Sequence, residues 1–221
     1  LITMFFTDSS VLGAAILTGT VVFSVLISLL VSKILSKTVL KGIPSGFILE
    51  LPPYRIPKFK KVFVRSAIDR TAKILGRAVL VTVPAGIIIW LCSYFPFGGK
   101  TVLEISATVL DPFARLFGLD GNVLCGFILS FPANEIVLPI MAMGYSGGLL
   151  SELGSLSETA ALFSENGFTS VTALCSIIFF LFHWPCATTV LTVKKETGSL
   201  KWTLAAILIP TMIGIILCSA V

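Results

Sequence analysis

The chain has 221 residues, of which 56% are hydrophobic and 12% are charged. Because an ordinary soluble domain has about 25% charged residues, this composition excludes such a domain and predicts an integral membrane protein. The net charge of +5 comes mainly from residues 33–77, which hold eleven of the 16 basic residues. A basic stretch of this kind is typical of a cytoplasmic loop, so we do not expect a nucleic-acid-binding surface.

The first predicted domain, residues 1–57, consists of a membrane helix and a proline-rich elbow. Residues 11–32 contain no charged side chain. At about 1.5 Å per residue they are long enough to cross a hydrocarbon core of about 30 Å. The prolines and glycines of residues 42–57 forbid a regular helix. Residues 58–77 interleave basic and apolar side chains, which predicts an amphipathic helix on the inner leaflet or, alternatively, a basic flank of the next span.

Residues 78–221 are expected to form one transmembrane domain. Within it, residues 78–95, 168–193 and 202–221 have the length and apolar composition of membrane helices. Residues 101–118 are too polar for a span that faces lipid, which favours an interfacial or half-membrane helix. We therefore expect an all-α, polytopic membrane fold.

The most unusual predicted element covers residues 121–145. Its apolar sequence carries Asn134 and Glu135 near the centre, between Pro132 and Pro139. Because proline removes a backbone donor and clashes with the preceding turn, we expect this helix to break twice. Irregular backbone at membrane depth is tolerated only where protein buries it or where it lines a polar cavity. We therefore predict that both polar side chains line a permeation pathway, with Glu135 as a buried carboxylate; a structural ion pair or cap is the alternative.

The charges of the loops favour a re-entrant hairpin for residues 121–145. If the basic stretch 33–77 is cytoplasmic, the next helix ends outside. A full crossing by residues 121–145 would then place Lys194 and Lys195 outside, against the tendency of basic residues to remain inside. A hairpin that enters and leaves on one side instead places the acidic residues 146–166 outside and these lysines inside. The alternative is an extra crossing by the polar segment that precedes the hairpin.

A second broken helix is predicted within residues 168–193, at the sequence FLFHWPCATT. His183 and Cys186 are three residues apart and share a helix face, and Pro185 lies between them. Paired interrupted segments of this kind indicate a transporter binding site between them. Nitrogen, sulfur and oxygen ligands suit a first-row divalent cation. The candidate metal ligands are Glu135, Cys186, His183 and Cys125. The alternatives are a core histidine and a buried cysteine that packs as a small apolar residue.

Residues 98–101, GGKT, do not form a phosphate-binding loop. The first glycine of that motif would fall at position 94, which is Tyr94, and the stretch follows a membrane helix instead of a strand. We therefore expect no nucleotide site on this chain.

Three motifs resemble the C-terminal membrane part of the ferrous iron transport protein B family, including its second Gate domain. They are ELPPYRIP (residues 50–57), FPANEIVLPI (residues 131–140) and HWPCATTVLTVKKETGSLKWT (residues 183–203). The resemblance implies a multi-pass protein of the cytoplasmic membrane, with the lipid bilayer as its surroundings, Fe(II) as its substrate and no permanently bound cofactor. It also assigns gate roles to the breaks at Pro132–Pro139 and Pro185–Cys186.

The same resemblance implies partners that this chain lacks, namely an N-terminal GTP-binding domain and a first Gate half. GTP would act only through that absent domain, so the chain itself is not expected to be an enzyme. A homo-oligomer is a further assembly that the residues leave open. Two alternatives to ferrous iron transport also stay open: a Gate-type transporter for another divalent metal or a nucleoside, and a non-transporting membrane scaffold.

Overall fold

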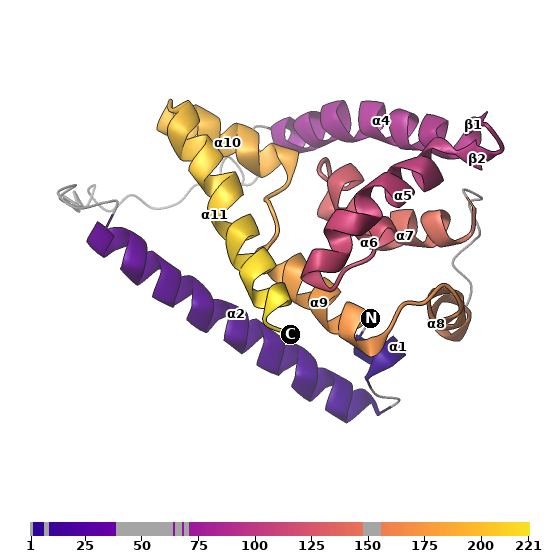
Figure 1. Ribbon diagram of the computed structural model, residues 1–221. Coiled ribbons are helices and arrows are strands. Elements are labelled where there is room, and N and C mark those ends of the chain that lie inside the picture. Colours follow the sequence, from indigo (N-terminus) through magenta and orange to yellow (C-terminus); the bar gives the residue numbers. More distant parts are fainter. Residues whose placement is uncertain (1, 7–8, 39–63, 65–67, 69–70, 148–155) are drawn as a thin grey trace, which may run out of the picture. The chain divides into compact units, whose positions relative to one another are not determined.

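The computed structural model describes residues 2–6, 9–38, 64, 68, 71–147 and 156–221. Its described part is almost entirely helical, which confirms the predicted all-α fold (Figure 1). The α-helices are α1 (Ile2–Phe5), α2 (Ser10–Thr38), α4 (Lys73–Tyr94), α5 (Val102–Ala114), α6 (Gly121–Leu129), α7 (Val137–Tyr145), α8 (Leu156–Glu165), α9 (Ser170–Phe182), α10 (Ala187–Thr197) and α11 (Leu200–Ser219). Two 3₁₀ turns, η2 (Arg115–Phe117) and η3 (Asn134–Ile136), and two short paired strands, β1 (Pro96–Phe97) and β2 (Lys100–Thr101), complete the described elements.

The chain divides into two units, which we describe separately: Ala15–Arg77, and Leu1–Ala14 together with Ala78–Val221. The smaller unit contains most of α2, which includes the first predicted span. The predicted elbow at 42–57 lies outside the described residues, as does most of the predicted surface helix at 58–77. The last residues of that predicted helix, from Lys73, belong to α4 instead, so this span begins earlier than expected.

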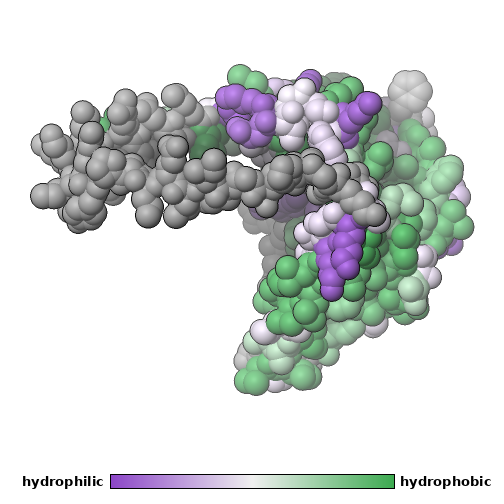
Figure 2. Space-filling model, turned by 90° about the vertical axis from the view of Figure 1, so that its left-hand side faces the viewer, coloured by the Kyte–Doolittle hydropathy of each residue, from purple (hydrophilic) through white to green (hydrophobic). Residues whose placement is uncertain are grey.

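Four stretches in the described residues are long and apolar enough to cross a membrane. They are Val11–Thr38, Ile74–Tyr94, Ser170–Thr197 and Leu200–Ser219. Hydrophobic residues also cover much of the coloured surface in Figure 2, where water would be a poor neighbour for them. Both observations support the predicted polytopic membrane protein.

The larger unit is built around a hairpin of two short helices. Helices α6 and α7 have nine residues each, or about 13 Å, and neither is long enough to cross a hydrocarbon core of about 30 Å. Tyr145, at the end of α7, donates a hydrogen bond to Asp120, which caps the start of α6. The hairpin therefore begins and ends at the same place, as the loop charges indicated for a re-entrant segment.

Glycine permits the close packing of the hairpin on its neighbour α5. A Cβ atom added at Gly121 would lie 2.0 Å from the carbonyl oxygen of Ala107, which is far inside contact distance. Inside the hairpin, a Cβ at Gly126 would lie 2.9 Å from Cγ of Met141. The core of this unit then forms from large buried side chains of α6, α8 and α9, such as Phe127, Phe163 and Phe179.

The hairpin contains one break, and the prediction of two is wrong. The helix ends at Leu129, and Pro132 lies in the turn that follows. Pro139, in contrast, is the third residue of α7. The first N–H groups of a helix have no intrahelical acceptor, so a proline in this turn removes no hydrogen bond. The second predicted broken helix is confirmed: α9 ends at Phe182 and α10 begins at Ala187.

Candidate permeation site at two helix breaks

The two breaks meet in space. The backbone N–H of Ala187, the first residue of α10, donates a hydrogen bond of 2.8 Å to the carbonyl oxygen of Phe131, in the turn after α6. Both groups lie at helix ends, where the helix itself offers no partner. The ring of Phe127 also lies 5.2 Å from the ring of His183, between centroids. We call this meeting point, from Phe131 to Asn134 and from His183 to Ala187, the break junction.

His183 is a buried residue at the break junction, with 8% of its surface exposed. Its Nδ1 lies 2.8 Å from the carbonyl oxygen of Phe180. A carbonyl oxygen can only accept, so Nδ1 carries a proton and Nε2 presents a lone pair in the neutral ring. Nε2 is buried and has no hydrogen-bond partner. The position expected for a metal ligand therefore holds an unused electron-pair donor.

Unpaired buried polar atoms are rare in the described part of the chain and collect at the break junction. Three such side-chain atoms occur there: Ser93 Oγ, Asn134 Oδ1 and His183 Nε2. A buried polar group without a partner costs about 1–3 kcal/mol of stability. The two atoms at the break junction are both acceptors. A water molecule or a cation would satisfy either of them.

Glu135 is exposed, which contradicts the expectation of a buried carboxylate. It is the middle residue of η3, and a 3₁₀ turn has three residues per turn, so successive side chains point in three directions. Asn134 and Ile136 are half-buried, and Glu135 takes the outward direction. Its role in a pathway stays a prediction.

Cys186 is half-buried and precedes the first residue of α10. Its Sγ lies 3.1 Å from Oγ1 of Thr188 and 3.2 Å from Oγ1 of Thr189, and both hydroxyls can donate to it. The N-terminal end of a helix also favours negative charge. This environment suits a thiolate, which is the form of cysteine that binds metal ions.

The predicted metal ligands do not form a closed site. Cys125 is 3% exposed and packs in an apolar cluster with Ile140 and Met143, as a small hydrophobic residue would. Across the residues that the structure describes, no three His, Cys, Asp or Glu side chains are grouped so that they could hold a metal ion. The break junction therefore offers separate ligands, of a kind that an ion could contact in passing.

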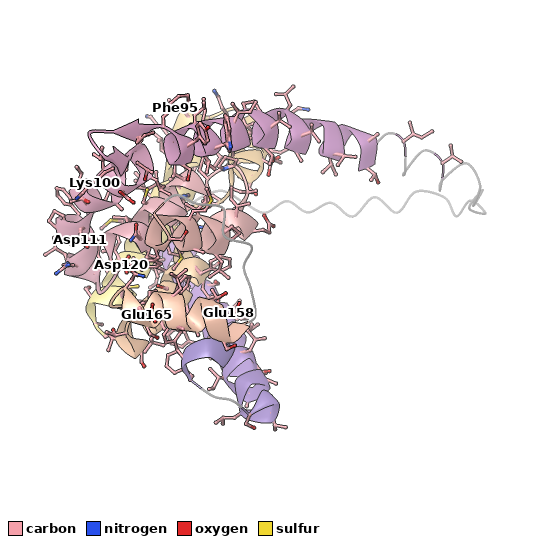
Figure 3. All side chains as sticks on the ribbon, turned by 90° about the vertical axis from the view of Figure 1, so that its right-hand side faces the viewer. Phe95, Lys100, Asp111, Asp120, Glu158 and Glu165 are labelled. Carbon is pink, nitrogen blue, oxygen red and sulfur yellow. The ribbon has the colours of Figure 1, made fainter. Side chains whose placement is uncertain are left out.

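A polar pocket of about 440 Å³ lies at the open end of the hairpin, and the sequence-based prediction missed it. Its acidic lining residues are Glu104, Asp111 and Asp120; Figure 3 shows the last two close to Lys100. Each acid has a structural role. Glu104 completes a capping box, Asp111 accepts from the N–H of Gly121, and Asp120 caps α6.

The sequence did carry signals for these structural roles. Thr101 followed three residues later by Glu104 is the pattern of a capping box, and an aspartate just before an apolar run is a typical N-cap. Burial, together with the neighbouring Asp120, raises the pKa of Tyr145, so its hydroxyl stays protonated and keeps donating. The pocket is thus part of the structural support of the hairpin.

Two cysteines form a contact between helices that the sequence did not indicate. Sγ of Cys218, in α11, donates to the carbonyl oxygen of Cys175, in α9, at 3.3 Å. Sγ of Cys175 lies 3.8 Å from the carbonyl oxygen of Cys218. Both residues are fully buried. This reciprocal pair fixes α11 against the first half of the second broken helix.

Comparison with known proteins gives two matches to family models. Residues 17–69 match the model described as ferrous iron transport protein B C terminus. Residues 75–200, which include both breaks, match the model named Gate, described as nucleoside recognition.

Several curated proteins named Fe(2+) transporter FeoB are similar to this chain. The protein of Staphylococcus aureus is 31% identical over 186 residues, which are 80% of this chain and 26% of that protein. The protein of Leptospira biflexa is 30% identical, over 77% of this chain and 27% of its own length. The protein of Methanocaldococcus jannaschii is 29% identical, over 76% and 26%. The chain thus spans about a quarter of the length of these relatives. No solved structure matches it.

Proposed function

We propose, from the fact that this chain belongs to the Gate family and carries a ferrous iron transport protein B C-terminal region, that it forms part of the ion pathway of a ferrous iron transporter. The break junction is the observation that carries the proposal. There, two interrupted helices share a backbone hydrogen bond, and each leaves one buried acceptor atom without a partner. Interrupted helices with free polar groups are the usual construction of ion sites in transporters.

In this proposal Fe(II) is the substrate and meets ligands one after another. Asn134 Oδ1 and His183 Nε2 offer lone pairs, and Cys186 offers sulfur at a helix N-terminus. Glu135, being exposed, would attract the cation toward the hairpin tip. Separate weak ligands suit transport, because an ion must bind well enough to enter and weakly enough to leave. Pro132 and Pro185 keep the backbone from closing into regular helix at both breaks.

We also infer that the chain works with further parts of a longer assembly. The relatives named Fe(2+) transporter are about four times as long as the matched region. A GTP-binding domain and a first Gate half would then act from outside this chain, in the cytoplasmic membrane, and the chain itself would neither hold a cofactor permanently nor catalyse a reaction.

Uptake of radioactive Fe(II) by the whole protein in proteoliposomes tests the proposal. The double variant Asn134→Ala, Glu135→Ala should lower the initial rate at least about tenfold, the scale of a disrupted metal contact. Glu165→Ala is the matched control, since it removes an exposed carboxylate of α8, away from the breaks. Unchanged uptake by the double variant at equal protein amounts would contradict the proposal. Nucleoside uptake by the wild type in place of Fe(II) would favour the alternative Gate function.

A further inference from the structure

We infer that His183 selects the class of metal ion that passes the break junction, admitting first-row transition ions such as Fe(II) and discriminating against Mg²⁺ and Ca²⁺. This inference rests on the proposed function and deepens it. It concerns selectivity, which none of the matches addresses.

The first observation is the fixed tautomer of His183. Its Nδ1–H donates to the carbonyl oxygen of Phe180 at 2.8 Å, and this leaves Nε2 as an unprotonated donor atom. Metal-bound histidines nearly always have this arrangement, in which a backbone carbonyl or carboxylate holds the other ring nitrogen and fixes the orientation of the ring. A histidine that served only for packing would need no free lone pair.

The second observation is that Nε2 is buried and unpaired. His183 is more than nine-tenths buried, and Nε2 has no hydrogen-bond partner in the structure. A polar atom in that position calls for a ligand. The ligand must be a donor or a cation, because the atom is a lone-pair acceptor.

The third observation is the apolar environment of the imidazole. Aromatic rings lie around it, with centroids 5.2 Å away for Phe127, 5.6 Å for Phe180, 6.0 Å for Trp184 and 6.2 Å for Phe179. Mg²⁺ and Ca²⁺ bind oxygen ligands, and Mg²⁺ gives up its water reluctantly. Imidazole instead suits Fe, Zn, Cu and Ni ions. A single nitrogen ligand among aromatic rings therefore discriminates by ligand type.

The fourth observation is location. His183 ends α9, and Cys186, whose sulfur has the same preference for transition metals, precedes α10 three residues later. The hydrogen bond from Ala187 to Phe131 connects this break to the hairpin that carries Asn134. An ion that crosses the break junction would therefore pass close to the imidazole.

The test compares two variants of His183 in the whole protein, in proteoliposomes, under reducing conditions. His183→Gln keeps a polar side chain but offers oxygen, and His183→Phe keeps an aromatic ring but offers no ligand. Fe(II) uptake is measured alone and with excess Mg²⁺, Ca²⁺ or Co²⁺ as competitor. In the wild type, Co²⁺ should inhibit uptake and the other two ions should not. Ser93→Ala is the matched control, because it removes the buried unpaired atom that lies outside the breaks.

We expect His183→Gln to reduce the preference for Fe(II) over Mg²⁺ at least about tenfold, and His183→Phe to reduce Fe(II) uptake by a similar factor. Normal uptake and an unchanged preference in His183→Gln would overturn the inference and leave the proposed function standing.

A binding measurement decides the inference even if the wild type carries no Fe(II), a result that would count against the proposed function alone. Co²⁺ added to the purified protein should give a visible absorption spectrum that His183→Phe weakens at least about tenfold in affinity and Ser93→Ala does not change. Equal Co²⁺ binding by the wild type and His183→Phe would overturn it.

Discussion

The N–H of Ala187 and the carbonyl oxygen of Phe131 form a 2.8 Å hydrogen bond between two helices that are both interrupted. Each group would be unsatisfied at a helix end inside a membrane, where no solvent is at hand. By pairing, they hold the tip of the α6–α7 hairpin against the start of α10. This one contact makes the two breaks a single structural feature.

Ala187→Pro should weaken that feature specifically. Proline is well tolerated at the first position of a helix, and Cys186 before it already has the extended conformation that proline requires, with φ −62° and ψ 159°. The substitution removes the donor to Phe131, which should lower stability by about 1 kcal/mol and reduce Fe(II) uptake. Heat-induced unfolding in detergent and proteoliposome uptake measure the two effects.

Leu200→Pro is the control for that variant, because Leu200 is the first residue of α11 and follows the extended Ser199. It should leave both unfolding and uptake close to those of the wild type. Equal effects of the two prolines would show that helix starts in general, and not the link between the breaks, are sensitive.

Gly121→Ala should separate α5 from α6. The added methyl would lie 2.0 Å from the carbonyl oxygen of Ala107, a backbone atom that cannot move away alone. We expect a loss of about 1–3 kcal/mol in stability, as for other overpacked sites. Gly86→Ala in α4 is the control, since nothing lies within 4 Å of its added Cβ. It should be neutral or stabilising by about 0.5–1 kcal/mol, and a destabilised Gly86→Ala would discredit the packing argument.

Tyr145→Phe should loosen the open end of the hairpin. The hydroxyl of Tyr145 donates to Asp120, and hydrogen bonds to charged groups contribute about 1.5–3 kcal/mol. Burial and Asp120 raise the pKa of Tyr145 above its ordinary value of 10.0. The folded state therefore favours the neutral phenol, and the stabilisation is complete below the ordinary pKa and declines as the pH rises above it.

Unfolding temperatures of the wild type and Tyr145→Phe at neutral and strongly alkaline pH measure this effect. The difference between the two proteins should be large at neutral pH and should shrink in alkali. A constant difference across the range would mean that the hydroxyl proton does not contribute.

Cysteine labelling should separate a pathway thiol from packing thiols. Cys186 is half-buried at the break, and Cys175 and Cys218 are fully buried between α9 and α11. In variants that keep one of these cysteines, a water-soluble thiol reagent should modify Cys186 readily and the other two at least about tenfold more slowly, because thiol reactivity follows exposure. Fe(II) present in excess should protect Cys186. Mass spectrometry gives the modified fraction, and equal labelling of all three would rule out this separation.

Much of the fold could be predicted from the sequence, because hydrophobic length is a local property. The apolar runs at 11–32, 78–95 and 202–221 all became helices, α2, α4 and α11. The proline at 185 likewise predicted an interrupted helix. The count of breaks in the hairpin failed at Pro139, because the effect of a proline depends on whether its N–H has an acceptor in the helix. That in turn depends on where the helix starts.

The candidate site was only partly accessible to sequence reasoning. Asn134, His183 and Cys186 were identified because polar residues are unexpected in apolar segments. The burial of Glu135 was predicted wrongly, since the direction of a side chain in a short 3₁₀ turn cannot be inferred from its position in an apolar run. The acids near Tyr145 were missed because their partners come from different helices.

The sequence alone determined the class of the protein, its spans and the existence of two interrupted helices, since these depend on composition and on the backbone chemistry of proline. The tertiary structure decided that the interruptions meet, that Phe180 fixes the protonated nitrogen of His183, and that Asp120 joins Tyr145. Each of these depends on a distance between atoms, and hydrogen bonds act only when donor and acceptor are brought within about 3 Å.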